Sequence, residues 1–461
     1  MKWCLIGMPY LFWVLVFSKP CAAGNKMNPP LIRPNFIFIL SDDQGWNGTS
    51  VRMDKDREDS RSDYHQTPQL ELLARSGMRF SSAYAPSCVC APTRYSIQFG
   101  QTPARLRMTR VGMNTDHIDH SQLSIPKMLK RIDSRYAVAH FGKWHIEANP
   151  EDLGYDESDG RTRNSHGGMS KTKWSVFKVD EDPKLIFSLT RRGIDFMERQ
   201  TKADRPFYLQ ISHYATHADI VSRASTLKKY QQSAKGQLHK IPAFAAMTED
   251  LDTGVGMVLD AVRTLGVEDT TYIIYMGDNG AVPKIPPKPP VYTRSYNYPL
   301  GRGKWDLMEG GIRVPFIISG PGIEHNSQCD VPVTGCDLLP TISALAGAKQ
   351  KLPDNLDGGS LTSLLQGRGK GTVKRQNKGL VFHFPHKNGS GLKREHSAIR
   401  MGRWKLLRFW DNHQRMLFDL NNDICEANDL AIQMPEKADE LETALTNYLQ
   451  CVGAEIPRCK E

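Results

Sequence analysis

Four runs of apolar residues stand out along the chain and indicate strands. They are Phe36–Leu40, Tyr136–Ala139, Phe207–Ile211 and Tyr272–Met276. Most of these runs are continuous, whereas a strand with one face in water would alternate apolar and polar residues. Continuous runs are typical of strands that are covered on both faces. Because helical stretches separate the runs, the pattern predicts an α/β domain around a largely parallel sheet.

Residues 67–77 illustrate the helices that we expect between the strands. Thr67 occupies an N-cap position, Pro68 the first helical position and Gly77 the position after the end. These residue types favour the beginning and the end of a helix. We therefore expect a helix over residues 68–76.

A different pattern begins after the basic, glycine-containing stretch 367–375. Leu380–Phe384, Ser397–Trp410 and Arg415–Leu420 indicate short antiparallel strands, and Pro435–Leu449 carries apolar residues at helical spacing. This pattern predicts a small α+β subdomain. The expected organisation is a signal peptide over residues 1–24, a large N-terminal domain over 25–370 and a C-terminal subdomain over 371–461.

The N-terminus has the pattern of a secretory signal. Lys2 precedes the apolar run Leu5–Phe17, and Cys21–Gly24 supplies a cleavage context of small residues. The run is too short for a membrane-spanning helix and lacks a stop-transfer flank. We therefore expect an exported protein, periplasmic or secreted, with no membrane span.

The chain is basic. Removing residues 1–24 removes Lys2 and Lys19, so the formal net charge falls from +10 to +8. This charge suits an acidic polymer, an anionic lipid or a nucleic acid, and it is equally compatible with a solvated surface that binds no partner. Since the sequence contains no nucleic-acid-binding pattern, we expect no nucleic-acid partner.

Polar residues that could take part in catalysis or ligand binding follow each of the four apolar runs. They are Asp42 and Asp43 after the first run, Lys143 and His145 after the second, His213 and His217 after the third, and Asp278 and Asn279 after the fourth. In open α/β sheets, ligands bind beyond the carboxyl ends of the strands. Each group taken singly is compatible with a solvated turn. Four such groups at one edge of a sheet indicate an active site.

Four of these residues offer oxygen ligands: Asp42, Asp43, Asp278 and Asn279. Hard oxygen ligands suit calcium or magnesium, and they suit zinc or copper poorly. Taken singly, an Asp-Asp pair is also compatible with a helix cap, and Asp-Asn-Gly with a tight turn. Together they favour one divalent cation per chain, calcium first and magnesium second.

The stretch Cys88–Arg94, with the sequence CVCAPTR, places two cysteines one residue apart. Four explanations compete for Cys90: a disulfide, a metal site, a reactive thiol, or a cysteine that is chemically converted. Beyond the predicted signal the chain has seven cysteines, an odd number, so at least one has no disulfide partner within the chain. The sequence leaves the pairing of the five others open: Cys329, Cys336, Cys425, Cys451 and Cys459.

Several segments resemble the type I sulfatases of the alkaline-phosphatase superfamily, and among them the arylsulfatases and N-acetylgalactosamine sulfatases. The similar segments are PNFIFILSDDQGW, CAPTR, HFGKWHI, MGDNG and GRGKWDLMEGGIRVPFI, followed by CDLLPTISALAG and LDGGSL. The resemblance covers nearly the whole chain beyond the predicted signal. It implies a large, mostly parallel mixed sheet between helices, as in alkaline phosphatase, and an enzyme that hydrolyses sulfate esters.

The resemblance also gives Cys90 a role. In this family a maturation enzyme oxidises the signature cysteine, which has proline at +2 and arginine at +4, to Cα-formylglycine. Cys90 has Pro92 and Arg94 at these positions, whereas Cys88 lacks them. The aldehyde hydrates to a geminal diol, and one hydroxyl of the diol attacks sulfur and displaces the alcohol. The second hydroxyl then lets the covalent intermediate collapse to aldehyde and sulfate.

The resemblance implies the other site residues as well. The ligands of the cation would be Asp42, Asp43, modified Cys90, Asp278 and Asn279. Arg94 would orient the diol, Lys143 and Lys304 would bind the sulfate, His145 would assist collapse of the diol, and His217 would be the acid for the leaving oxygen. His213 is a rival to His217, because the sequence YATHA lacks the Pro-His of the family. A surface role for Lys304 remains an alternative.

Three classes of function follow. The first is an exported, metal-dependent sulfuric ester hydrolase that acts on a sulfated carbohydrate. The second is a phosphodiesterase or phosphonate monoester hydrolase of the same superfamily, although Lys143 and Lys304 favour sulfate. The third is a catalytically inactive homologue that binds polyanions. Because every expected catalytic position is occupied, the sequence argues against this third class.

Overall fold

The computed structural model describes Met1 and residues 33–168, 175–283, 296–388 and 391–457. The predicted signal peptide over 1–24 lies outside the described residues, apart from Met1. A search of the described helices finds none that is long and apolar enough to cross a membrane. From Arg33 onward the chain forms one unit, which is built around a large sheet.

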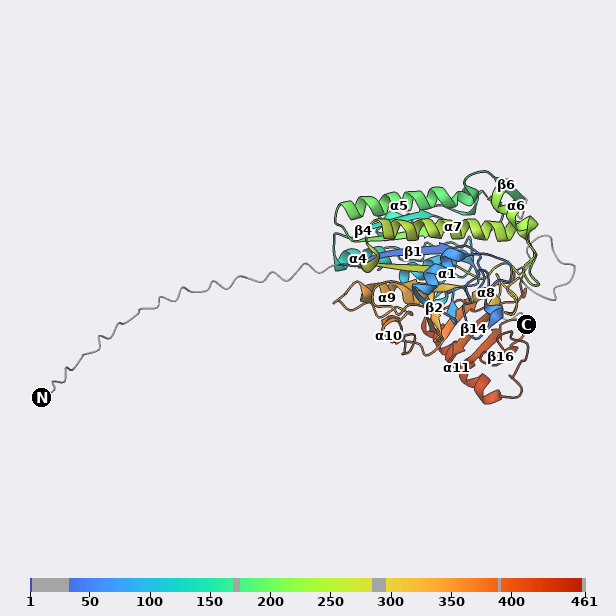
Figure 1. Ribbon diagram of the computed structural model, residues 1–461. Coiled ribbons are helices and arrows are strands. Elements are labelled where there is room, and N and C mark those ends of the chain that lie inside the picture. Colours follow the sequence, from blue (N-terminus) through green and yellow to red (C-terminus); the bar gives the residue numbers. More distant parts are fainter. Residues whose placement is uncertain (2–32, 169–174, 284–295, 389–390, 458–461) are drawn as a thin grey trace. The chain divides into compact units, whose positions relative to one another are not determined.

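The large sheet has eight strands, most of which are parallel (Figure 1). Its order is β11 (Ser327–Cys329), β2 (Gly77–Phe80), β10 (Phe316–Ser319), β9 (Thr271–Gly277), β1 (Asn35–Ser41), β7 (Phe207–Ser212), β4 (Ala137–Gly142) and β5 (Glu157–Ser158). β10 runs antiparallel to both of its neighbours, and the other neighbouring pairs are parallel. The four apolar runs become β1, β4, β7 and β9, which are adjacent parallel strands. The predicted α/β sheet is confirmed.

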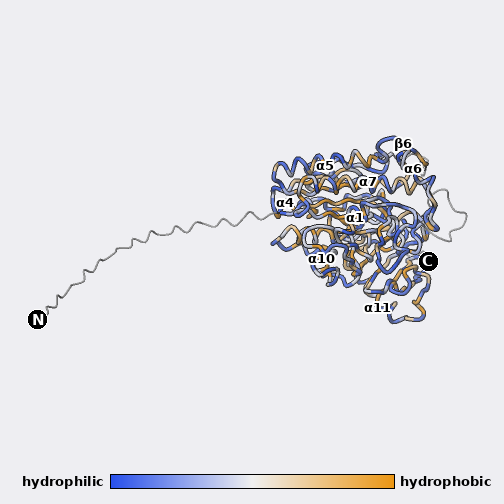
Figure 2. The backbone as a smooth tube through the Cα atoms, viewed as in Figure 1, coloured by the Kyte–Doolittle hydropathy of each residue, from blue (hydrophilic) through white to orange (hydrophobic). Residues whose placement is uncertain are grey.

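The sheet is buried on both faces, as the continuous apolar runs predict. Along β1, Phe36, Phe38 and Leu40 pack on one face, and Ile37 and Ile39 pack on the other. The first face is covered by α2 (Cys90–Phe99), α4 (Ile125–Ile132) and α9 (Leu338–Leu345), and the second by α1 (Pro68–Arg75), α5 (Ile186–Lys202) and α7 (Pro242–Thr264). Figure 1 shows β1 between α7 and α9. In Figure 2, hydrophobic colour runs through the middle of the unit, and hydrophilic colour predominates along α5 on its outside.

Shorter elements connect these layers. They are β3 (Ala83–Tyr84), α3 (Pro103–Leu106), β6 (Val176–Val179), β8 (Ile220–Arg223), α6 (Ala224–Gln232), α8 (Glu309–Ile312), β12 (Val333–Thr334) and α10 (Thr362–Gln366). β6 pairs with β8, and β3 with β12, as small parallel sheets beside the large one.

The N-terminus of α1 is capped differently from the sequence prediction. Pro68 is the first residue of the helix, as expected, but the Thr67 hydroxyl does not cap it. That hydroxyl accepts a hydrogen bond from the backbone N–H of Ser50 at 2.8 Å. The first N–H groups of α1 donate instead to the carboxylate of Asp252 on α7, at 2.9 and 2.8 Å. A distant residue therefore satisfies the helix end, and no local pattern could indicate it.

Gly77 follows the end of α1, as predicted, and has a second role as the first residue of β2. The helix itself ends at Arg75, with Ser76 as its C-cap. A Cβ atom at this position would lie 2.3 Å from the carbonyl oxygen of Ile318 on β10. Close approach of the neighbouring strand thus requires a glycine here.

The C-terminal part forms a second, antiparallel sheet. Its strands, in order, are β13 (Leu380–Phe384), β14 (His396–Met401), β15 (Trp404–Phe409) and β16 (Arg415–Asp419), followed by α11 (Pro435–Cys451). α11 packs on one face of this sheet through Leu441 and Leu445. The other face packs through Phe382 and Leu407 against residues next to α8 and α2. The predicted α+β subdomain is confirmed, while its boundary at residue 370 stays a prediction.

Candidate active site

The candidate residues meet at the carboxyl ends of β9, β1, β7 and β4. Asp42 and Asp43 follow β1, Lys143 follows β4, His217 lies beyond β7, and Asp278 follows β9. Backbone hydrogen bonds continue between neighbouring strands past these ends, with the N–H of Asp278 donating to β1 and that of Lys143 to β7. Because the four strands are parallel neighbours, the side chains that follow them converge on one place.

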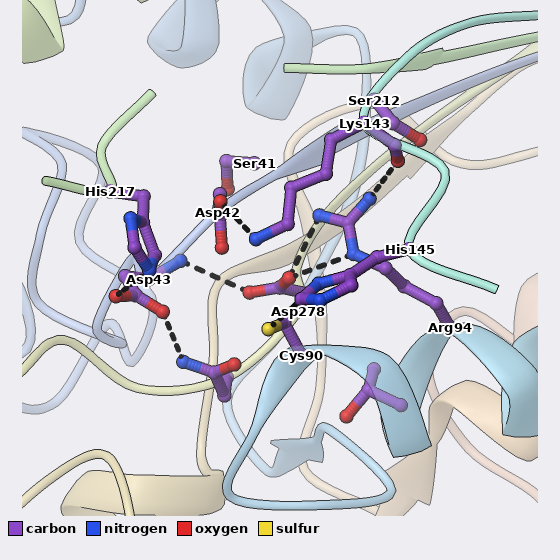
Figure 3. Close-up of polar contacts among 12 residues, drawn as sticks. Ser41, Asp42, Asp43, Cys90, Arg94, Lys143, His145, Ser212, His217 and Asp278 are labelled. Atoms are coloured by element: carbon purple, nitrogen blue, oxygen red, sulfur yellow. Dashed lines mark hydrogen bonds and ion pairs between the residues drawn. The ribbon is translucent and has the colours of Figure 1, made fainter. Parts of the chain in front are cut away.

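Cys90 and Arg94 reach the same place from the first turns of α2. They are four residues apart, so they share one face of the helix. Arg94 Nε and Nη2 donate to Asp278 Oδ2 at 3.1 and 2.8 Å, and its Nη1 donates to the carbonyl oxygen of Lys143. Cys90 Sγ lies 3.3 Å from His145 Nδ1. Figure 3 shows Cys90, His145, Arg94 and Asp278 together.

Each candidate lysine pairs with one of the two carboxylates after β1. Lys143 Nζ donates to Asp42 Oδ2 at 2.5 Å, and Lys304 Nζ lies 2.7 and 2.8 Å from the two oxygens of Asp43. Together with the arginine pair, the centre therefore holds three cations and three carboxylates. These six side chains are at most 6% exposed. Such pairs are strong because little water screens them.

The charges shift the pKa values of two carboxylates in opposite directions. Burial by itself would raise the pKa of Asp42, but Lys143 and the other cations hold that pKa below its usual range. Burial and the charge of Asp42 raise the pKa of Asp278 to about 7, and Arg94 only partly opposes them. A further positive charge at this centre would therefore favour the ionised form of Asp278.

Two oxygen atoms without a donor indicate where a cation fits. Asp42 Oδ1 and Asn279 Oδ1 are buried, and neither has a hydrogen-bond partner in the described part of the chain. Two overlapping sets of ligand atoms lie within 4.8 Å of one another: those of Asp42, Cys90 and Asp278, and those of Asp42, Asp43 and His217. Buried acceptors without donors are costly, and a cation that prefers oxygen ligands would satisfy them. The oxygen atoms that Asp42, Asp43, Asp278 and Asn279 offer fit calcium or magnesium.

The structure distinguishes the two rival histidines. His217 Nδ1 donates to the carbonyl oxygen of Ala218 at 3.0 Å, and its Nε2 lies 3.7 Å from Asp43 Oδ2. The side chain of His217 is 12% exposed, so it lies at an edge that solvent reaches. His213 is fully buried, approaches α7 at Gly254, and has no hydrogen-bond partner for either ring nitrogen among the described residues. The structure thus brings His217, and not His213, to the other candidates.

Burial lowers the pKa values of the histidines at this centre. It lowers the pKa of His217 to about 4, with a further lowering effect from Lys304. The pKa of His145 is also well below its usual range, because of burial and the charges of Lys143 and Arg94. Both rings are therefore neutral at pH 7 in the site as described, and protonation of either requires a nearby negative charge.

Two residues at the site carry no distinctive sequence pattern. The Thr216 hydroxyl donates to the backbone carbonyl oxygens of Asp42 and Asp43, both at 3.2 Å. Lys184, just before α5, is 4% exposed and donates to the Ala218 carbonyl oxygen at 3.0 Å. Neither contact could be inferred from sequence spacing, because each depends on a fold that joins distant segments.

The C-terminal sheet holds the segment that carries Lys304. Glu309 accepts hydrogen bonds from Lys405 Nζ of β15 at 2.9 Å and from Arg313 Nε at 2.6 Å. The N–H of Glu309 donates to Glu426 at 2.6 Å. All of these side chains are buried. Glu309 therefore contacts structural cations and not the candidate reacting groups.

The structure narrows the explanations for Cys90. The described cysteines form no disulfides with one another, so Cys329 and Cys336 do not pair. Cys459, a potential partner of Cys451, lies outside the described residues. Burial raises the pKa of the Cys90 thiol, and a reactive thiolate requires a lowered pKa. A metal site and chemical conversion remain as explanations.

Comparison with known proteins places these features in context. A family model described as "Sulfatase" matches residues 34–348, and a model described as "N-sulphoglucosamine sulphohydrolase, C-terminal" matches residues 303–454. A protein named "Sulfatase" from Formosa agariphila is 26% identical over 92% of this chain and 89% of its own length. The N-acetylgalactosamine-6-sulfatase of Mus musculus is 26% identical over 73% of this chain and 67% of its own length.

A solved structure shows the same fold. Ps i-CgsB, in complex with k-i-k-neocarrahexaose, superimposes with a TM-score of 0.73 at 23% sequence identity. The match covers 90% of this chain and 93% of that chain. The match therefore extends over most of both chains.

Proposed function

The chain belongs to the sulfatase family and is a sulfuric ester hydrolase, and we propose that it hydrolyses sulfate esters of an anionic carbohydrate. In this proposal residue 90 acts as a formylglycine nucleophile beside one divalent cation. The observation that carries the proposal is the approach of Cys90, at the start of α2, to the carboxylates of Asp42 and Asp278. The names of the relatives, together with the basic mature chain, support a carbohydrate substrate.

Residue 90 is the proposed nucleophile, and its Sγ atom marks where an oxygen of the diol would lie. Arg94, one helical turn away, would orient the diol and neutralise charge on it. His145 Nδ1, 3.3 Å from that sulfur, is placed to accept a proton when the diol collapses and releases sulfate. Conversion of the cysteine requires a maturation enzyme as a partner, and export by the predicted signal is part of the same proposal.

Asp42, Asp43, Asp278 and Asn279 are the proposed protein ligands of the cation, together with residue 90. The unpartnered oxygens of Asp42 and Asn279 support this assignment. We propose calcium, with magnesium as the second choice, because all four side chains offer oxygen. When bound, the cation would supply positive charge that favours a deprotonated hydroxyl on residue 90.

Lys143 and Lys304 are the proposed sulfate-binding residues. Both ammonium groups lie at the candidate metal centre, each bonded to one of its carboxylates. Preorganised cations of this kind stabilise the charge that develops on the sulfuryl oxygens. With Arg94 they would surround the scissile ester in the proposed complex.

The function is tested by comparing matched esters on enzyme that has been coexpressed with a maturation enzyme. We expect 4-nitrophenyl sulfate to be turned over with a higher kcat/KM than bis(4-nitrophenyl) phosphate, a phosphodiester. Faster turnover of the phosphate would favour a phosphodiesterase or phosphonate hydrolase. Lack of turnover of every sulfate ester, with residue 90 converted, would favour an inactive polyanion-binding homologue.

His217 should act as the acid for the leaving oxygen, with the negative charge of the bound ester favouring the protonated ring that burial disfavours. We expect His217→Ala to lower kcat for a sugar sulfate by about 10² to 10⁴, because a sugar alkoxide leaves poorly without a proton. The loss should be much smaller for 4-nitrophenyl sulfate, whose leaving group is acidic. Steady-state kinetics with both esters measures the difference.

His213→Gln is the matched control for this variant. His213 lies away from the other candidates, so this substitution should not change the ratio of the two rates. An equal loss with both esters in His217→Ala would contradict the assignment. A changed ratio in His213→Gln would transfer the role to His213.

A further inference from the structure

Lys184 is a buried cation for which the described part of the chain supplies no ion-pair partner. Its side chain is 4% exposed, and its Nζ makes one hydrogen bond, to the carbonyl oxygen of Ala218 at 3.0 Å. Its ammonium group forms no ion pair with any carboxylate of the described ranges. Lys143 and Lys304, by contrast, are each paired with a carboxylate. Burying an unpaired charge is costly, so this arrangement needs an explanation.

The carboxylates adjacent to Lys184 are engaged elsewhere. Asp182 caps α5, accepting the N–H of Phe187 at 2.7 Å. Asp219 accepts the N–H of Ser175 at 2.9 Å. Burial lowers the pKa of Lys184 to about 8, although the charge of Asp42 partly offsets this effect. Neither neighbouring carboxylate therefore forms an ion pair with the Lys184 ammonium group.

The backbone is strained where Lys184 turns inward. Lys184 and Leu185 have φ angles of 54° and 57°, in the left-handed region that residues other than glycine rarely adopt. Leu185 is 40% exposed, although it is apolar, whereas the charged Lys184 is buried. Strain of this kind persists where the surrounding structure enforces it and is typical of functional sites.

Lys184 lies beside the proposed acid for the leaving oxygen. The Ala218 carbonyl oxygen accepts hydrogen bonds from both Lys184 Nζ and His217 Nδ1, each at 3.0 Å. Only one carbonyl group therefore separates the free ammonium donors from the ring of His217. His217 faces the alcohol part of the ester in the proposed reaction. If His217 has this role, Lys184 lies next to the part of the site that would hold the sugar.

Resting on the proposed function, we propose that Lys184 forms an oxyanion subsite for a second negative group on the substrate sugar. An ammonium group has three N–H donors, and Ala218 uses one of them. A carboxylate or a second sulfate would accept from the other two and pair with the charge. The preferred substrate is then a saccharide with two anionic groups, one of which is the scissile sulfate.

The experiment compares matched saccharides on the mature enzyme. One arm pairs a uronate-containing sulfated disaccharide with its carboxyl-reduced form, and the other pairs a disulfated disaccharide with its monosulfated form. We expect wild type to prefer a doubly anionic member by about tenfold or more in kcat/KM, since charge-assisted hydrogen bonds are stronger than neutral ones. The arm that shows the preference identifies the group as carboxylate or sulfate.

Variants of Lys184 then test whether this residue carries the preference. Lys184→Met should reduce the ratio within the pair to near one, mainly through KM, and Lys184→Arg should keep most of it. Lys184→Gln removes the charge and retains a hydrogen-bond donor for Ala218. It replaces Lys184→Met in this test if the methionine variant has a much lower melting temperature than wild type. Lys228→Met removes an exposed lysine from α6 and should preserve the ratio.

Two outcomes would overturn the subsite. One is an equal loss of kcat/KM for both members of each pair in Lys184→Met, which would make Lys184 a structural residue. The other is a wild-type enzyme without preference in either arm. Failure of the proposed function looks different, because wild type would then turn over neither the saccharides nor 4-nitrophenyl sulfate.

Discussion

Cys90→Ala should lose turnover by a factor on the order of 10⁴ or more, because alanine cannot be converted to the attacking diol. Cys90→Ser should fail equally wherever the host modifies only cysteine, since one hydroxyl cannot expel the bound sulfate. Both variants should keep the fold, because among the described residues Sγ makes one polar side-chain contact, with His145. Values of kcat/KM and thermal unfolding curves measure these effects.

Cys88→Ala is the matched control, because Cys88 lies two residues earlier, in the loop that precedes α2. Cys88 is fully buried and packs in the cluster between the two sheets, and its carbonyl oxygen accepts the N–H of Trp305 at 3.1 Å. The substitution keeps that backbone contact and should cost about 1 kcal/mol of stability. Most of the activity should remain. Peptide mass spectrometry should find the aldehyde at position 90. An intact Cys90 thiol in fully active enzyme would contradict the proposed mechanism.

Asp278→Ala should abolish cation binding and activity together. Asp278 belongs to the proposed ligand set, and its Oδ2 accepts two hydrogen bonds from Arg94, whose side chain is 2% exposed. Removing the carboxylate therefore leaves a buried guanidinium without its partner, which costs about 3–5 kcal/mol. We expect no calcium in elemental analysis of the purified variant and a lower melting temperature.

Asp278→Asn removes the negative charge of the side chain and keeps its size and shape, so it distinguishes the two effects. It retains one side-chain oxygen and should fold better than the alanine variant, yet its cation affinity should fall by at least about 100-fold. Asp252→Asn is the control, because Asp252 is equally buried but caps α1. This control should retain one calcium per chain. Stoichiometric calcium in Asp278→Ala would show that the assigned ligands are wrong.

The sequence predicted those elements whose signal is local. The runs at β1, β4, β7 and β9 are long and apolar enough to predict strands from the sequence alone. The helical spacing after Pro435 predicted α11. β2 and β11 are short strands that carry no such pattern, and β10, although apolar, has only four residues, so their pairing depends on contacts with distant strands. Thr67 and Pro68 hold the predicted positions at the start of α1. The carboxylate that satisfies the first N–H groups of the helix could not be predicted, because Asp252 is remote in the sequence.

The sequence by itself indicated most of the chemical groups that the site holds, although not Thr216 or Lys184. Asp42, Lys143 and Asp278 directly follow the ends of parallel strands, and Cys90 and Arg94 share a helix face by their spacing. Covalent order enforces both arrangements. Only the tertiary structure decided which of these groups touch. It separated His217 from His213, paired Lys143 with Asp42, and placed Lys184 beside His217. Such contacts join segments far apart in the chain, and the packing of the whole sheet and its helices determines their geometry.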